Sequence, residues 1–380
     1  MSRLFIFFDI INLYNGGRGI IMKKFWSLFL IIVLLLSTAC QSSATMQVKS
    51  NNTSANPEQD KTQGENINIA TEQPIKPEII IDENANENGK IMILMYHGIG
   101  DEEKEWVRTS ANFRKDLETL YSKGYRLISL MDYVNNNIKV EAGYTPVVIT
   151  FDDGLLNQFN IIEENGIKKI DPDCAVGMLE DFYKEHKDFG RAASFYIYYP
   201  VPFRQKELIK EKFEFLINNG YEIGNHSYNH PSLGKIALEE VDEQLAMNVK
   251  STKDYVPDYV VESLALPFGE APKGENYSHV VSGAYEGVEY LNKAVLKVGS
   301  NPALSPNNKD FDPLKLPRVR ASELNTAGTG IYDWLTYFEK NPDKRYISDG
   351  NPDVVTVPST EEANIDKDKL LGKELRMYNK

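Results

Sequence analysis

The chain has 380 residues and a hydrophobic content of 42%, enough for one large folded domain or two ordinary ones. Its net charge of -13 argues against a nucleic-acid partner, because such a partner requires a basic surface. The only cysteines are Cys40 and Cys174, and Cys40 ends a hydrophobic run, so a disulfide framework is excluded for the folded part. We therefore expect Cys174 to pack as a small hydrophobic residue.

The N-terminal region is predicted to contain an export signal over residues 22–40. Two lysines follow Met22, an apolar run spans residues 25–36, and small residues lead directly to Cys40. The Ser-Thr-Ala-Cys junction resembles a bacterial lipobox, although Ser37 stands where leucine is usual. This resemblance predicts a lipid on Cys40 and an anchored protein on the extracellular face of the bacterial cell membrane. An ordinary cleaved signal is the alternative.

Two further segments precede the folded domain. Residues 1–21 are interpreted as a misassigned upstream extension, because the glycine-rich run at 16–19 is what a ribosome-binding site encodes when it is translated. Residues 41–89 are rich in Asn, Ser, Thr, Gln and Glu, and they contain too little apolar surface to offset the entropy of ordering. They are predicted to form a flexible polar tether, and residues 90–380 are predicted to form the folded domain.

Strands and helices are expected to alternate along this domain. Strands are predicted over residues 91–95, 127–130, 146–151, 192–199, 221–224 and 264–266, and helices over 110–123, with Ser110 as its N-cap, 206–219 and 239–256. This alternation predicts an α/β fold with a parallel sheet that closes into a barrel. In such barrels the chemistry lies at the C-terminal ends of the strands.

Asp152 and Asp153 follow the strand at 146–151 directly. Neighbouring strand residues point to opposite sides, but a turn at Gly154 can bring both carboxylates to one pocket. One carboxylate could then bind a cation while the other transfers protons. The alternative is a pair of turn-forming aspartates.

His226 and His230 are four residues apart, a spacing that places both imidazoles on one face of a helical turn. Two such imidazoles and a carboxylate from elsewhere can hold one Zn²⁺ with a position left open for water. The alternative is two exposed polar histidines, but the chain contains only five histidines, so a chance pair is uncommon.

Thr-Phe-Asp-Asp-Gly at 150–154, followed by His-Ser-x-x-His-Pro at 226–231, resembles the polysaccharide deacetylase family, carbohydrate esterase family 4 or the NodB-homology domain. The resemblance covers about residues 91–346. It implies a distorted (β/α) barrel of about seven parallel strands and a divalent metal, usually zinc, held by Asp153, His226 and His230. It also implies that Asp152 is the general base. The implied activity is hydrolysis of carbon–nitrogen bonds other than peptide bonds, removing N-acetyl groups from poly-N-acetylglucosamine or peptidoglycan.

The third motif of the family departs from its usual form here. Ala265 stands where an arginine usually orients the base, and Arg318 or Arg320 is a candidate for the missing cation. The backbone N–H of Phe268, in the same motif, remains available to stabilise the oxyanion.

The usual C-terminal general acid is also missing, because no histidine follows His279. His97 instead follows the first strand of the domain, which resembles the branch of the family that deacetylates poly-N-acetylglucosamine through a permuted barrel. His97 is therefore the predicted general acid. The alternative is that His97 is a buried structural histidine whose ring is hydrogen-bonded to the backbone. Trp334 could line the acetyl pocket or pack in the core.

Two other functions are considered for this sequence. One is an esterase that removes O-acetyl groups from a polysaccharide. The other is a catalytically impaired glycan-binding lipoprotein, which the missing arginine suggests. The expected partners are an acetylated polysaccharide and a membrane, reached through the lipid on Cys40, and the chain is expected to be a monomer.

Overall fold

The structure is a computed structural model in which residues 83–380 are described. The predicted upstream extension, the export signal with Cys40, and the tether as far as residue 82 lie outside the described residues. No helix within residues 83–380 combines the length and the hydropathy that a membrane crossing requires.

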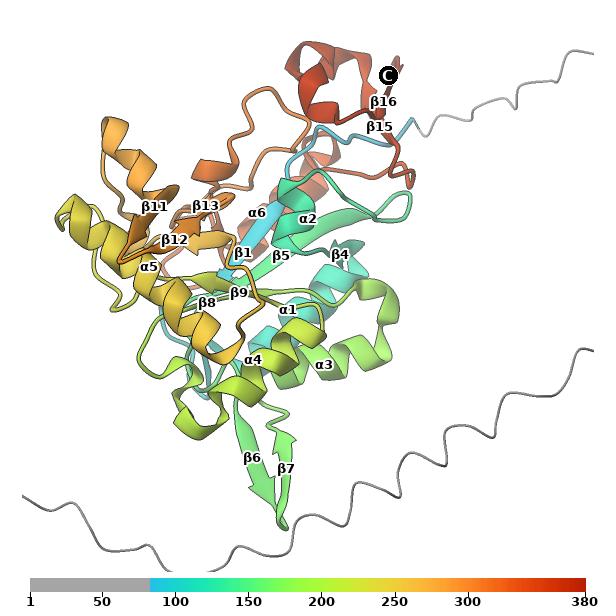
Figure 1. The fold of residues 1–380 in the computed structure, drawn as a ribbon. Coiled ribbons are helices and arrows are strands. Elements are labelled where there is room, and N and C mark those ends of the chain that lie inside the picture. The colour runs from blue at the N-terminus through green and yellow to red at the C-terminus, as the bar shows by residue number, and fades with distance from the viewer. Residues whose placement is uncertain (1–82) are drawn as a thin grey trace, which may run out of the picture. The chain divides into compact units, whose positions relative to one another are not determined.

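A parallel sheet forms the centre of the fold (Figure 1), with the strand order β13-β10-β9-β8-β5-β1-β14 and with β4 paired to the start of β5. The strands of this sheet are β1 (Met92–Tyr96), β4 (Tyr125–Leu127), β5 (Thr145–Phe151), β8 (Ser194–Ile197), β9 (Glu222–Asn225), β10 (Ser263–Ala265), β13 (Ala294–Leu296) and β14 (Val319–Arg320). Every pairing between them is parallel.

The two ends of this sheet meet. Leu316, just before β14, forms a parallel bridge with Leu296 at the end of β13. The N–H of Lys297 donates to Leu316 O at 2.9 Å, and the N–H of Leu316 donates to Val295 O at 2.9 Å. Seven strands therefore form a ring, which confirms the predicted distorted (β/α) barrel of parallel strands.

Helices lie outside this ring, and small two-stranded ribbons extend from it (Figure 1). The helices are α1 (Ser110–Ser122), α2 (Leu130–Val134), α3 (Ala175–Glu185), α4 (Ile209–Asn218), α5 (Leu238–Tyr255) and α6 (Ile331–Lys340). The ribbons are β2 (Gly98–Gly100) with β3 (Val107–Thr109), β6 (Ile161–Glu164) with β7 (Ile167–Ile170), β11 (Ser282–Tyr285) with β12 (Val288–Leu291), and β15 (Val354–Pro358) with β16 (Glu374–Tyr378).

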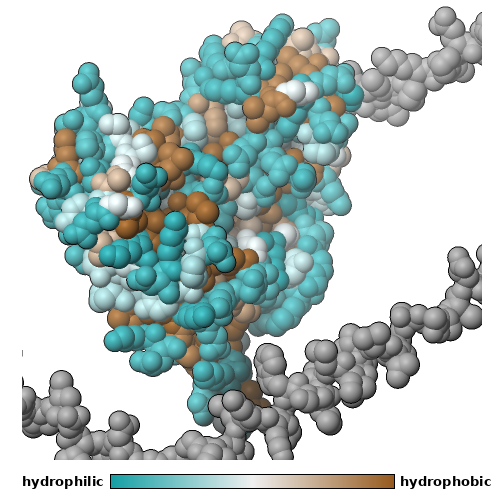
Figure 2. Space-filling model, viewed as in Figure 1, coloured by the Kyte–Doolittle hydropathy of each residue, from teal (hydrophilic) through white to brown (hydrophobic). Residues whose placement is uncertain are grey.

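Successive side chains of the strands belong to different clusters, as the period of two requires. In β1, Leu94 packs with the residues of α1 and α3, while Ile93 packs with Tyr196 of β8. The ring of Tyr196 fits only because residue 224 is glycine: a Cβ there would lie 2.3 Å from Tyr196 Cε1. The face shown in Figure 2 is largely hydrophilic, with the apolar side chains in separate patches.

Two local predictions were wrong. The N-cap of α1 is Thr109 rather than Ser110, because Thr109 Oγ1 accepts the Asn112 N–H at 3.1 Å. The apolar run at 127–130 is not one strand: β4 ends at Leu127, and Ser129 caps α2 by accepting the Asp132 N–H at 2.9 Å. The expectation that Cys174 packs inside is confirmed, since its side chain is buried.

The predicted end of the tether at residue 89 was too late. Residues 85–89 are buried, and Asn86 forms an antiparallel bridge with Ile347 near the other end of the chain. Glu87 accepts hydrogen bonds from the Thr356 N–H at 2.9 Å and from the Tyr346 hydroxyl at 3.1 Å. This segment is held in place by hydrogen bonds between its polar residues and distant partners. The sequence therefore contains no apolar pattern from which its ordered structure could be predicted.

Candidate active site

The site lies at the C-terminal ends of β1, β5 and β9. Tyr96 pairs with Phe151 in register, and the Asp152 N–H donates to Tyr96 O at 3.0 Å. His97 and Asp152 therefore leave the sheet at the same level, side by side. Neither position follows from local spacing, because 55 residues separate the two strand ends.

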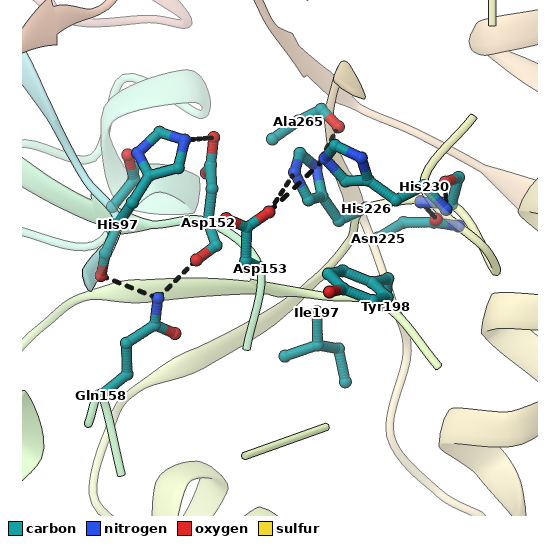
Figure 3. A network of polar contacts seen from close by, with 12 residues as sticks. His97, Asp152, Asp153, Gln158, Ile197, Tyr198, Asn225, His226, His230 and Ala265 are labelled. Carbon is teal, nitrogen blue, oxygen red and sulfur yellow. Dashed lines mark hydrogen bonds and ion pairs between the residues drawn. The ribbon is translucent and has the colours of Figure 1, made fainter. Parts of the chain in front are cut away.

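Both neighbouring aspartates face histidines of one cluster: Asp152 lies beside His97, and Asp153 faces His226 and His230 (Figure 3). Asp152 continues the inward alternation of β5 and is buried. Asp153 has a φ of +79° and Gly154 has a φ of +55°, so the chain reverses immediately after the strand. This left-handed turn directs the second carboxylate back toward the pocket, as the sequence predicted.

Asp153, His226 and His230 offer three ligand atoms that all lie within 4.8 Å of one another. Asp153 Oδ1 is 3.5 Å from His226 Nε2 and 3.4 Å from His230 Nε2. One carboxylate and two imidazoles are the donor set of a catalytic divalent-metal site, and these residues fit such an ion.

The orientation of His226 supports this assignment. Its Nδ1 lies 2.8 Å from Ala265 O, and a carbonyl oxygen can only accept, so Nδ1 carries the proton and Nε2 faces Asp153. Burial disfavours a charge on this ring, but Asp152 and Asp153 outweigh it and raise the pKa of His226 above its usual value. The two carboxylates thus favour positive charge at His226.

The two histidines do not lie on a helical turn, and that expectation was wrong. Ser227 and His230 have φ values of +62° and +59°, so residues 226–230 form an irregular loop. Asn225 Oδ1 accepts the Ser227 N–H at 2.8 Å, and Ser227 Oγ accepts the His230 N–H at 2.9 Å. The loop still brings the two imidazole centroids within 4.7 Å.

Arg318 holds the carboxylate of Asp152. Its Nη1 and Nη2 donate to Asp152 Oδ1 and Oδ2, each at 2.7 Å, and its Nε donates to Lys297 O at 3.0 Å. The guanidinium is fully buried. Burial alone would raise the pKa of Asp152, but Arg318, followed by the nearby histidines, lowers it below its usual range. Asp152 is therefore ionised at neutral pH.

Arg320 lies elsewhere, and of the two predicted arginines only Arg318 reaches the base. Nη1 of Arg320 donates to Glu105 Oε1 at 3.0 Å, and its guanidinium lies 5.2 Å from the ring centre of Trp106. Residues two apart on a strand share a face but are separated by roughly 6.6 Å along it, so Arg320 sits nearer the rim.

His97 lies beside the same carboxylate. Its Nε2 is 3.8 Å from Asp152 Oδ2, and the ring of Trp106 lies 4.7 Å from its own. Burial lowers the pKa of His97, and Asp152 only partly opposes this. The sequence did not single out Trp106, because an exposed loop tryptophan carries no periodic signal.

Gln158 was also missed. Figure 3 shows its side-chain amide between the backbone carbonyls of His97 and Asp152. A lone glutamine in a loop carries no recognisable pattern.

Phe268 and Trp334 occupy different surroundings. The ring of Phe268 is exposed and lies 4.8 Å from that of His230, at the edge of the metal-ligand cluster. Trp334 lies on α6, packs against Phe338 and donates its Nε1–H to Ser300 O at 2.7 Å. Of the two alternatives for Trp334, the structure therefore shows packing against the core.

Residues 139–279 match the family model described as polysaccharide deacetylase. This match includes Asp152, Asp153, His226, His230 and Phe268, while His97 and Arg318 lie on either side of it. No curated protein matches the sequence.

Several solved structures resemble this one. The Streptococcus pyogenes deacetylase PplD in complex with acetate shares 17% identity, with a TM-score of 0.47 over 66% of this chain and 98% of that one. IcaB from Ammonifex degensii shares 16% identity, with a TM-score of 0.42 over 63% of this chain and 94% of that one. A de-N-acetylase from Aggregatibacter actinomycetemcomitans shares 14% identity, with a TM-score of 0.43 over 65% of this chain and 99% of that one.

Proposed function

We propose that this chain, whose residues 139–279 match the polysaccharide deacetylase family model, is a hydrolase that removes N-acetyl groups from an amino-sugar polymer in a metal-dependent reaction. The observation that carries the proposal is the placement of Asp152. Arg318 holds it from one side, His97 lies on the other, and the adjacent Asp153 belongs to the metal-ligand cluster.

Asp152 is the base of this proposed reaction. Its two oxygens are fixed by Arg318, and at neutral pH it is in the ionised form, which is the form that can accept a proton from the attacking water. The bidentate contact also restricts the carboxylate to one orientation, so the base does not have to be ordered during the reaction.

His97 is the proposed acid. An amide is cleaved only if its nitrogen leaves as a protonated amine, so a proton donor is needed close to the base. The Nε2 of His97, 3.8 Å from Asp152 Oδ2, occupies that place. A backbone N–H at Phe268 is the proposed donor to the oxyanion.

Asp153, His226 and His230 would hold the divalent cation, for which zinc is the proposed identity. When bound, the cation supplies Lewis-acid polarisation of water and of the acetyl carbonyl. His226 keeps its Nε2 lone pair aimed at the cluster through its Nδ1–H bond to Ala265 O.

The proposed setting is the cell surface. The signal-like residues 22–40 and the lipobox-like junction at Cys40 support a lipid-anchored protein on the extracellular face of a bacterial membrane. Poly-N-acetylglucosamine and peptidoglycan are the substrates that such a location offers a deacetylase.

The alternative of an impaired binding protein rested on the missing arginine at Ala265. Arg318 makes the contact to the base that such an arginine would make, so this reason for expecting impairment falls away. An O-acetyl esterase remains the second candidate, because the same base and cation cluster would serve an ester.

Acetate release tests the proposal. The full chain, supplied with Zn²⁺, is incubated with N-acetylglucosamine oligomers and separately with an O-acetylated xylan, alongside Asp152→Asn as the inactive control. Acetate from the oligomers that disappears in the variant supports the proposal. Acetate from xylan alone establishes the esterase, and binding without acetate release from either substrate refutes both hydrolytic readings.

A further inference from the structure

Beyond its last paired residues, the sheet cannot itself fix the spacing of His97 and Asp152. The β1–β5 ladder ends at Tyr96 and Phe151, and the Asp152 N–H makes the final contact across it. The carbonyl oxygens of His97 and Asp152 point beyond this last rung. Beyond this rung the β1–β5 ladder pairs no further residues, so it does not join the backbones of His97 and Asp152 at these oxygens.

Gln158 joins them. Its Nε2 donates one hydrogen bond to His97 O at 3.0 Å and a second, shorter one to Asp152 O. Both N–H groups of the amide are thus used, one on each strand end, as Figure 3 shows. The side chain is fully buried, so no water competes for these contacts.

The remaining atom of this amide indicates that the link has a cost. Oε1 of Gln158 is buried and has no hydrogen-bond partner within the described residues. An orphaned buried acceptor costs about 1–3 kcal/mol, and such groups are rare in folded proteins. An apolar side chain of similar size would avoid that cost but would leave the carbonyl oxygens of His97 and Asp152 without this donor, so the two links are what the glutamine contributes at this position.

The backbone of Gln158 is itself held firmly. The Val176 N–H donates to Gln158 O at 2.9 Å, and the Ala175 N–H donates to Asn157 O at 3.1 Å. These N–H groups belong to the first turn of α3, where no partner within the helix exists. The start of α3 therefore anchors the amide that spans the two strand ends.

We propose that Gln158 is a positioning residue that fixes the separation of the base Asp152 from the acid His97. This inference rests on the proposed deacetylase function, because it assigns Gln158 a task only if these two groups act together. Both side-chain hydrogen bonds of Gln158 go to backbone oxygens, so it acts through the backbone of the two residues it links.

Gln158→Met tests this, since methionine is unbranched and of similar length but cannot donate. A displacement of about 1 Å in a reacting group can cost about 100-fold, so we expect kcat to fall roughly 10- to 100-fold with little change in KM. Affinity for Zn²⁺, measured by calorimetry, is expected to stay at the wild-type value.

Gln205→Met is the matched control. Gln205 also cross-links backbone through two hydrogen bonds, accepting the Ile161 N–H at 3.0 Å and donating to Ile161 O at 2.8 Å. It ties the β6–β7 ribbon to the loop after β8 and contacts neither His97 nor Asp152. We expect the kcat of Gln205→Met to equal that of the wild type. The melting temperatures of both variants are also measured.

The outcomes separate cleanly. A fall in kcat for Gln158→Met alone, with Zn²⁺ affinity retained, supports the positioning role. Wild-type kcat in a folded Gln158→Met overturns the positioning role. A loss of kcat that Gln205→Met matches, or that is accompanied by lost Zn²⁺ affinity, also overturns it. Each of these results leaves the proposed function intact. A wild-type protein that releases no acetate overturns the proposed function instead.

Discussion

Replacing Arg318 by methionine tests how much this arginine contributes to stability and to kcat, apart from the other cations near the site. Arg318 is fully buried and bonds both oxygens of Asp152 at 2.7 Å. Its removal leaves a buried carboxylate without its counter-ion, and breaking such a pair costs about 3–5 kcal/mol. Because burial is the largest influence raising the pKa of Asp152, that pKa rises once Arg318 is gone.

Activity is expected to fall with stability. A general base contributes about 10²- to 10⁴-fold to the rate, and in Arg318→Met the base loses its orientation while its raised pKa disfavours its charged form. We expect kcat for acetate release at pH 7 to fall within that range. Urea unfolding of the same preparation gives the loss of stability, and activity is measured at a temperature where the variant is still folded.

Arg320→Met is the control, because it removes the same side chain two residues away. Arg320 pairs with the exposed Glu105, a type of contact worth about 0–1 kcal/mol, and it also donates to the backbone oxygens of Leu324 and Asn325. Its kcat and stability should stay close to wild type. The assignment of Arg318 fails if folded Arg318→Met keeps wild-type kcat, or if Arg320→Met loses as much activity.

Three other outcomes are expected. Chelation should abolish acetate release and Zn²⁺ should restore it, while His230→Ala should lose the single calorimetric Zn²⁺ site; tight binding in that variant would contradict the ligand assignment. His97→Gln should lower kcat on N-acetylglucosamine oligomers by about 10²- to 10⁴-fold but lower hydrolysis of p-nitrophenyl acetate far less, because that leaving group needs no proton; equal losses would argue against an acid. The pKa of Glu87 is raised from 4.5 to about 7, first by burial and then by Asp349. The folded chain therefore keeps the Glu87 proton where the unfolded chain has lost it, so stability decreases as pH rises through this window, by on the order of 3 kcal/mol in all. Glu87→Gln should flatten that decline between pH 5 and pH 8 in urea titrations, and an unchanged slope would show that Glu87 is not its cause.

The sequence by itself determined the parts of the site that are close together in the chain. Asp152 and Asp153 are adjacent, and His226 and His230 are four residues apart, so chain geometry alone keeps each pair together. The alternation of strands and helices also predicted the barrel. Because the predicted strands end at these residues, the site was expected at the C-terminal ends of the strands. The helical turn expected at His226 was wrong, yet the loop that replaces it preserves the short distance between the rings.

Tertiary structure decided everything that depends on which strands are neighbours. Arg318 and Asp152 are 166 residues apart, and they meet because β14 pairs with β1, which also pairs with β5. From the sequence, Arg318 and Arg320 were equal candidates for the cation that contacts the base. Only their positions along β14 distinguish them. Residues 85–89 and Gln158 were beyond prediction for the same reason, since the hydrogen bonds that they do make go to partners that only the closed barrel brings within reach.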